Sequence, residues 1–275
     1  MNPDDIIDLT MYPLHDLQSE RGLRLVKTCK ESLNKTALCL LPDFIRPQAL
    51  KIMKDEISVL TPQAHYKCEE HTPYFKKNFS DWPAGHPEAR RSTFQYAQIV
   101  TPDIPAQTMM SKLYQWNPLT QFVQQAVGAD SLFRSACPTL SLTVKVAGEG
   151  DTDGWHYDGN DFVISLLLQS SECGGEFEYA PYIRTKDDEN YEAVTRLLND
   201  PDNFGMRPVI KPGTFVLFNG ELSLHRVRAV GQTSKPRMIA LFSYDYTPDQ
   251  VFPVSYCKQL QQYPRLSEIE KSATA

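Results

Sequence analysis

The feature that most constrains the fold is a series of short apolar segments in the second half of the chain. From about residue 95 they follow one another closely, and most are bounded by Gly, Pro, Asn or Asp. This length and punctuation are typical of strands joined by turns. The expected strands are TFQYAQIVTP, LSLTVKVA, DFVISLLLQ, GEFEYAP, RPVIKPGTFVLF, LHRVRAV and RMIALFSYDY.

The first third of the chain has a different pattern. Residues 17–33 and 46–60 carry apolar side chains at helical spacing, and residues 36–45 between them predict one strand. Residues 62–92 are polar, aromatic and proline-containing, which indicates a long ordered loop of the kind that often covers a site. The charged insert 184–205 predicts a surface helix.

Helices in front of a run of strands favour a mainly β fold, a double-stranded β-helix (jelly-roll) core with N-terminal helical support. No flexible boundary divides the chain, so we predict a single domain over 1–275. Within it we expect mainly helical support and a covering loop at 1–93, the jelly-roll core at 94–250 and a C-terminal helical tail at 251–275.

Composition narrows the class of protein. A net charge of −6 argues against a nucleic-acid partner. No apolar run is long enough to span a bilayer, and the first residues lack the basic and apolar regions of a signal peptide. The six cysteines are scattered without a C-x-x-C pair, which indicates reduced thiols. We therefore expect a cytoplasmic protein with a small-molecule partner.

The segment GWHYDGNDFVISLLLQ contains the candidate metal ligands. His156 and Asp158 are two residues apart at the opening of an apolar strand, and in extended backbone such residues share a face. His225, just after the strand GTFVLF, supplies a third ligand. Two histidines and one carboxylate are the facial triad of non-haem Fe(II) oxygenases. An H-x-D triplet alone is weak, and a loop histidine bonded to its neighbouring aspartate explains it equally well.

Arg237 adds to this context. It begins the last apolar strand, where a guanidinium can bind a carboxylate through two parallel hydrogen bonds. An exposed arginine after a turn is the alternative. Arg226 and Arg228 are nearer to His225 but alternate off its face, so we rank them lower. The remaining histidines have no spaced partner and are predicted as surface or packing residues: His15, His65, His71 and His86.

The order H-x-D, distant His, then Arg resembles the 2-oxoglutarate/iron(II)-dependent oxygenase superfamily. Residues 153–246, including GGEFEY, SLHRV and SYD, look most similar to the branch of free-amino-acid (lysine-type) hydroxylases and radical halogenases. The resemblance implies Fe(II) at His156, Asp158 and His225, with Arg237 on the distal carboxylate of the cosubstrate 2-oxoglutarate. It also implies use of O2, with succinate and CO2 as coproducts.

The resemblance also bears on the outcome of the reaction. Halogenases of this branch carry glycine at the position of Asp158, which leaves room for a halide. A carboxylate at that position predicts oxygenation, most simply hydroxylation of an unactivated C–H bond in a free amino acid or similar small molecule. Desaturation, ring closure, a peptide or other metabolite as substrate, and a non-catalytic jelly-roll binding protein remain alternatives.

The candidate substrate-binding residues are proposed only from their positions in the sequence. Arg91, with Arg90 as its rival, resembles the arginine of the branch that binds the substrate carboxylate. Asp153, Trp155 and Asn160 flank the metal triplet and could line the pocket. For Glu176 and Glu178, which share a face after the GG turn, a structural role comes first. No pair of acids can be assigned to a lysine-like side chain.

Overall fold

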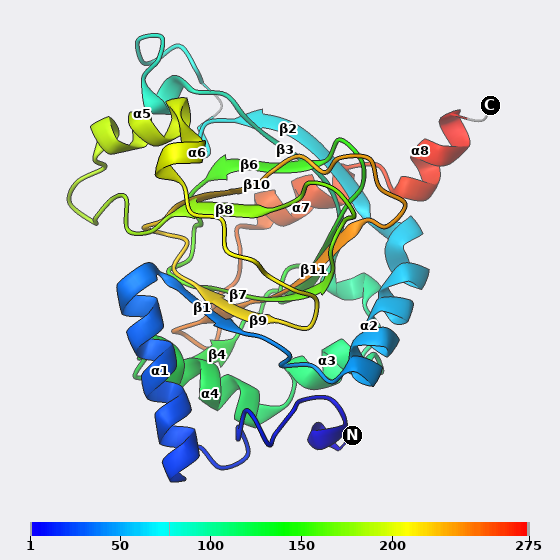
Figure 1. The fold of residues 1–275 in the computed structure, drawn as a ribbon. Coiled ribbons are helices and arrows are strands. Elements are labelled where there is room, and N and C mark those ends of the chain that lie inside the picture. The colour runs from blue at the N-terminus through cyan, green and yellow to red at the C-terminus, as the bar shows by residue number, and fades with distance from the viewer. Residues whose placement is uncertain (1, 77, 274–275) are drawn as a thin grey trace.

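The strands of the computed structural model, which describes residues 2–76 and 78–273, form mainly one curled antiparallel sheet (Figure 1). Its ten strands run in the order β1-β9-β7-β11-β5-β3-β6-β10-β8, and β2 pairs with β3. A small second sheet pairs β4 with β12. The strands are β1 (Leu38–Leu41), β2 (His65–His71), β3 (Ser92–Ile99), β4 (Phe133–Arg134), β5 (Leu142–Ala147), β6 (Thr152–His156), β7 (Val163–Gln169), β8 (Phe177–Ala180), β9 (Phe215–Phe218), β10 (Leu224–Val227), β11 (Arg237–Phe242) and β12 (Tyr244–Asp245).

Most of the helices support this sheet from outside. Figure 1 shows α1, α3 and α4 below the half that contains β7, β9 and β1, with α2 at its edge. The helices are α1 (Glu20–Thr36), α2 (Pro47–Leu60), α3 (Met109–Tyr114), α4 (Asn117–Val127), α5 (Tyr191–Asn199), α6 (Pro201–Phe204), α7 (Val254–Gln262) and α8 (Leu266–Ala273), with short 3-10 turns at Pro3–Asp5, Thr61–Gln63, Pro87–Ala89 and Thr101–Asp103.

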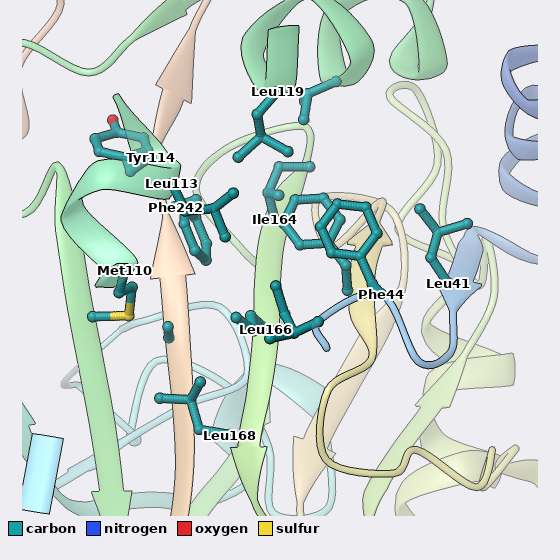
Figure 2. Close-up of a cluster of buried hydrophobic side chains, with 14 of the residues drawn as sticks. Leu41, Phe44, Met110, Leu113, Tyr114, Leu119, Ile164, Leu166, Leu168 and Phe242 are labelled. Carbon is teal, nitrogen blue, oxygen red and sulfur yellow. The ribbon is translucent and has the colours of Figure 1, made fainter. Parts of the chain in front are cut away.

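The main hydrophobic core lies between these helices and the outer face of the sheet. In Figure 2, Leu119 of α4 and Met110, Leu113 and Tyr114 of α3 pack over side chains of β7 and β11. Because alternate residues of each strand point to opposite faces, this core leaves the inner face free for other side chains. The fold is a double-stranded β-helix with flanking helices, as the strand pattern predicts.

Three strands were not predicted: β2, β4 and β6. Residues 65–71 form β2, although the polar composition of 62–92 indicates a loop. Polar side chains on both faces of β2 hide the alternation that identifies a strand. Residues 152–156 form β6, so His156 ends a strand of its own and does not open the strand of residues 163–169.

Two further expectations, on the insert and on the cysteines, agree with the structure. The insert contains a helix, α5, and all six cysteines are free. Across the described residues, no helix is both long and apolar enough to cross a membrane.

Candidate metal centre

The three side chains predicted as metal ligands meet on the inner face of the sheet. His156 is the last residue of β6, and His225 lies opposite it on the neighbouring strand β10. Asp158 follows in the loop after β6. One ligand atom from each residue lies within 4.8 Å of the other two. The two imidazole Nε2 atoms are 3.7 and 3.4 Å from the Asp158 oxygens.

A bulge in β6 turns His156 inward. On β10 two steps separate His225 from Val227, but three steps separate their partners His156 and Asp153 on β6. The extra residue lets Asp153 and His156 both face inward, against the usual alternation. Gly154 fits this bulge because a Cβ there would lie 2.3 Å from Ser92 Oγ and 2.7 Å from a backbone nitrogen.

Backbone carbonyls fix the tautomer of both ligand histidines. His156 Nδ1 lies 2.6 Å from the Gly154 carbonyl oxygen, and His225 Nδ1 lies 2.9 Å from that of Ser223. A carbonyl only accepts, so each Nδ1 carries the proton and donates it. Each Nε2 is then a bare lone pair directed at the centre, as metal-bound histidines require.

Burial and charge also suit a cation. Burial and, to a smaller extent, the neighbouring His225 lower the pKa of His156 to about 3, so this imidazole is neutral at pH 7. For His225, burial lowers the pKa but the Asp158 carboxylate outweighs it and raises the pKa. The pKa of Asp158 is lowered by the imidazoles despite its burial. Its Oδ2 is buried without a hydrogen-bond donor. Two bare nitrogens and an orphaned carboxylate oxygen fit a divalent metal ion.

Gly220 holds Asp158 in place. The Asp158 backbone N–H donates to the Gly220 carbonyl oxygen at 3.0 Å. A Cβ on Gly220 would lie 1.6 Å from Asp158 Oδ2 and 2.5 Å from its Cγ. The carboxylate therefore occupies the space that any side chain at position 220 would need. No signal in the sequence marked this glycine.

Arg237 is a buried cation without a counter-ion. It begins β11 on the inner face, and burial lowers its pKa to about 10, so it stays charged at neutral pH. Among the described residues its guanidinium has no hydrogen-bond or ion-pair partner. A buried, unpaired guanidinium is costly unless a ligand supplies an anion.

A cavity of about 480 Å³ opens beside the triad, with His156 and Asp158 in its wall. Its other walls come from β2, β3, β5, β11 and the start of α7. Two lysines in the wall, the buried Lys67 and the partly buried Lys145, are already paired: Lys67 with Glu69 at 2.8 Å, and Lys145 with Asp153. Residues 62–92, predicted to cover a site, contribute Lys67, Glu69, His71 and Phe75 to the wall, and Phe252 and Tyr256 add the C-terminal end of the chain.

The four predicted substrate residues do not gather in this cavity. The Arg91 side chain is 60% exposed and pairs with Glu70 at the surface. Asp153 faces inward, but its charge is taken up by Lys145. Trp155 points to the opposite face and packs with Tyr157 and α5. Asn160 lines a neighbouring hollow next to Tyr244.

Other charged residues near the site have structural partners. Arg90 donates to the Leu198 carbonyl oxygen. Glu178, which is fully buried, accepts from Arg226 at 2.7 Å and lies 3.6 Å from Arg228. These contacts agree with the lower rank given to Arg226 and Arg228, because both point away from the metal centre.

One known protein family matches most of this chain. The family model described as HalD, Halogenase D, matches residues 23–259. The chain belongs to the halogenase D family. A search of curated proteins gave no match.

Solved structures resemble this member of the halogenase D family in fold. An oxidoreductase of the 2OG-Fe(II) oxygenase family from Burkholderia pseudomallei has 14% identity and a TM-score of 0.51, over 82% of this chain and 92% of that one. The carbocyclase SnoK from nogalamycin biosynthesis, described as non-heme and alpha ketoglutarate dependent, has 11% identity and a TM-score of 0.54, over 87% and 91%. HygX from Streptomyces hygroscopicus, solved with nickel and 2-oxoglutarate, has 13% identity and a TM-score of 0.50, over 78% and 84%. At these identities the likeness concerns the fold alone.

Proposed function

We propose that this protein is an Fe(II)- and 2-oxoglutarate-dependent oxygenase that hydroxylates an unactivated C–H bond of a free amino acid or similar small molecule. Succinate and CO2 are the coproducts. The observation that carries the proposal is the convergence of His156, Asp158 and His225, each with a bare ligand atom, inside a double-stranded β-helix.

The triad would hold the iron, which when bound with 2-oxoglutarate and O2 supplies the oxidising power for C–H cleavage. The protein itself contributes orientation. The Gly154 and Ser223 carbonyls hold the proton of each neutral imidazole on Nδ1, which leaves Nε2 as the ligand atom, and Gly220 leaves room for the carboxylate. These groups are fixed before any ligand binds, so little reorganisation is needed.

Arg237 is the binding residue for the distal carboxylate of 2-oxoglutarate. It lies on the inner face of the sheet, buried and unpaired among the described residues, and a dicarboxylate supplies the missing negative charge. In a metalloprotein without a diacid cosubstrate, this buried guanidinium would have no anion to bind.

Hydroxylation is favoured over halogenation because of Asp158. Membership of the halogenase D family raises the possibility of halide chemistry. In this chain, however, a carboxylate fills the third protein ligand position and adds a negative charge that opposes a halide. The contact with Gly220 keeps the carboxylate there.

The cavity supports a small substrate. About 480 Å³ beside the metal ligands, partly covered by Phe252 and Tyr256, suits a metabolite better than a peptide. Desaturation, epimerisation or ring closure are second candidates, since an epimerase and a carbocyclase share the fold. A non-catalytic jelly-roll protein is the remote alternative.

A substrate screen tests the proposal. Purified protein is supplied with Fe(II), 2-oxoglutarate and single amino acids, with and without chloride, and succinate is measured. We expect succinate above background with at least one amino acid, a product that has gained one oxygen atom, and no chlorinated product. His156→Ala should lose this activity. No substrate-dependent succinate across the panel, or product formation by His156→Ala, contradicts the proposal.

A further inference from the structure

Lys145 places a positive charge in the wall of the cavity beside the metal centre. It lies on β5 and lines the cavity, and its side chain is 19% exposed. The other lysine of the wall, Lys67, is only 3% exposed. Much of the surrounding wall is apolar or aromatic: Phe75, Phe94, Tyr96, Leu140, Leu241, Phe252, Pro253 and Tyr256. In such a cavity a small number of polar groups decides how a ligand is oriented.

The hydrogen bonds of Lys145 leave part of its ammonium group available. Nζ donates to Asp153 Oδ2, and among the described residues it has no second hydrogen-bond partner. An ammonium group carries three N–H donors, so two remain for other acceptors. Asp153 itself does not line the cavity. The ion pair therefore holds Lys145 from outside the cavity, while the exposed part of its side chain meets the cavity.

Two aromatic rings fix the ammonium group near the metal ligands. Lys145 Nζ lies 4.4 Å from the ring centroid of Tyr96 and 5.9 Å from that of Phe94, both within the range of a cation–π contact. Phe94 also meets the His156 imidazole edge to face, with ring centroids 5.0 Å apart. Burial and His225 are the largest causes of the decrease in the His156 pKa, and the charge of Lys145 adds to it. The ammonium group is therefore a fixed charge beside the candidate metal ligands.

The other cations considered for ligand binding are placed differently. Arg91 is 60% exposed and paired at the surface. Lys67 is buried against Glu69, whose second oxygen accepts a hydrogen bond within the protein. Arg237 does not line this cavity and is the residue proposed to bind the cosubstrate. Of these cations, Lys145 combines a charge inside the cavity with a partly exposed side chain.

We propose that Lys145 binds the carboxylate of the substrate through the N–H groups of Nζ. The inference rests on the proposed oxygenase function and narrows its substrate class. A free amino acid carries the required α-carboxylate, whereas an amino acid amide or a residue within a peptide does not. Because aromatic side chains surround the ammonium group, a charge-assisted hydrogen bond there contributes more than it would at the open surface.

The competing explanation is that Lys145 only neutralises Asp153. Both roles predict damage in Lys145→Met, since this variant leaves a buried carboxylate unpaired. The two roles differ when both charges are removed. In Lys145→Met/Asp153→Asn no carboxylate is left unpaired, so the loss of a purely neutralising lysine has no effect. A substrate carboxylate, in contrast, would still lack its cation.

Pairs of compounds that differ in charge provide the probe. L-leucine, L-methionine, L-lysine, L-glutamine and L-serine are each compared with the primary α-amide, which has nearly the same shape but no α-carboxylate. Isothermal titration calorimetry on protein loaded with Mn(II) and 2-oxoglutarate gives Kd without turnover, and succinate formation with Fe(II) gives kcat/KM. The proteins are wild type, Lys145→Met, Asp153→Asn and the double variant. Melting temperature and Mn(II) affinity check the folding and the metal centre of each.

The expected effect is a preference for the acid. In wild type and in Asp153→Asn, an amino acid should bind about 10- to 100-fold more tightly than its amide, the scale of a hydrogen bond between charged groups. This preference should fall below about threefold in Lys145→Met and in the double variant, because only one cation is assigned to the carboxylate. The KM for 2-oxoglutarate should stay unchanged.

The outcomes separate the two proposals. Equal binding of acid and amide by the wild-type protein, or binding of none of the compounds, overturns the role of Lys145. Persistence of the preference in Lys145→Met, its recovery in the double variant, or an increase in the KM for 2-oxoglutarate in its place does so too. Selective binding of the acids without succinate formation from any amino acid overturns the oxygenase proposal instead and leaves the carboxylate site standing.

Discussion

Gly220 shows how much of the metal centre depends on a residue without a side chain. The Asp158 carboxylate fills the space where a Cβ would lie. Asp158 could be predicted because the H-x-D triplet marks it, but Gly220 could not, because nothing in NGELSLH shows which side chain packs on its Cα. The contact between positions 158 and 220 exists only in the folded chain.

Gly220→Ala is expected to displace Asp158 from the triad. With one ligand moved, Fe(II) affinity should fall about 10- to 100-fold, the size of effect seen when groups that orient metal ligands are lost. Titration with Fe(II) or Co(II) under anaerobic conditions measures it. Gly159→Ala is the control, because a Cβ at Gly159 meets nothing within 4 Å. Equal affinities for the two variants would contradict the assigned role.

Arg237→Lys should raise the KM for 2-oxoglutarate about 10- to 100-fold, because a lysine cannot bind a carboxylate through two parallel bonds. The measurement is succinate formation at varied 2-oxoglutarate and saturating substrate. Arg228→Lys, on the opposite face of the sheet, should leave this KM unchanged. An unaltered KM in Arg237→Lys would place the distal carboxylate elsewhere.

The predictions of substrate-binding residues were wrong where they depended on which face of a strand a side chain occupies. Arg91 precedes β3, on which Ser92, Phe94 and Tyr96 face inward, so Arg91 points outward. Trp155 would share a face with Asp153 in a regular strand, but the bulge at Gly154 turns it out. His71 lies in a segment whose strand character the sequence hides.

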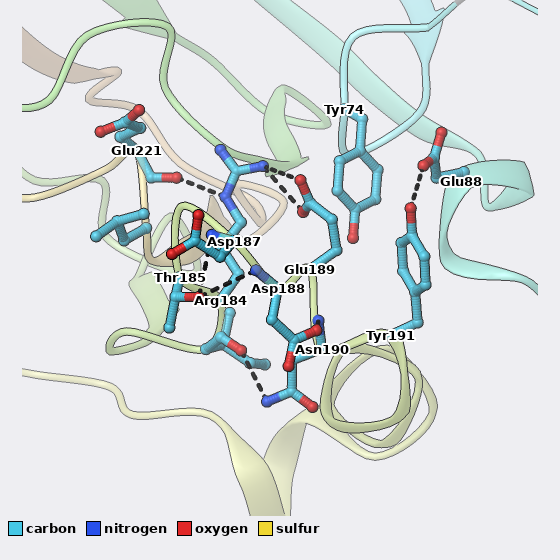
Figure 3. Close-up of polar contacts among 12 residues, drawn as sticks. Tyr74, Glu88, Arg184, Thr185, Asp187, Asp188, Glu189, Asn190, Tyr191 and Glu221 are labelled. Carbon is cyan, nitrogen blue, oxygen red and sulfur yellow. Dashed lines mark hydrogen bonds and ion pairs between the residues drawn. The ribbon is translucent and has the colours of Figure 1, made fainter.

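At the scale of elements, Glu178 joins β8 to β10 and to the segment after α6. It is fully buried and its oxygens meet Arg226, Arg228 and Arg207, the last at 3.8 Å. Figure 3 shows polar contacts that join the insert 184–205 to the rest of the protein. Arg184 contacts Glu189 and the Glu221 backbone, and Tyr191 donates to Glu88.

Glu178→Gln should lower the free energy of unfolding by about 2–3 kcal/mol. It removes a buried negative charge and leaves arginines without their partner, although their partial exposure to water limits the cost. Urea denaturation measures the change. Glu176→Gln, on an exposed residue of the same segment, should alter stability by less than about 0.5 kcal/mol. Similar losses in both variants would argue against the role of the buried cluster.

The order of elements was largely predictable, since short apolar strands between turns define the double-stranded β-helix. Two of the elements that were not predicted, β2 and β6, contribute polar residues to the inner face. Strands that line a site lose the apolar alternation that reveals other strands. The same chemistry that makes the site therefore hides the elements that build it.

At the scale of the whole molecule, the core and the site occupy opposite faces of one sheet. Helices α3 and α4 bury the outer face, and α7 reaches back so that Tyr256 covers the inner one. Stability and metal binding are thereby separated, and an empty metal centre need not unfold the protein.

Metal binding should nevertheless raise the melting temperature through linkage. At a free metal concentration about 100 times Kd, binding adds about 2.7 kcal/mol, which corresponds to roughly 5 °C for a protein of this size. Differential scanning fluorimetry with Fe(II), Mn(II) or Co(II) under anaerobic conditions tests this. His156→Ala should show little shift, and an equal shift in that variant would indicate binding elsewhere.

The bulge in β6 makes the metal centre sensitive to the length of this strand. Gain or loss of one residue in β6 with the bulge retained would turn the His156 imidazole to the outer face of the sheet. Helices α3 and α4 would still cover the far face of the barrel. Such a chain would keep the architecture but lose one of its three metal ligands.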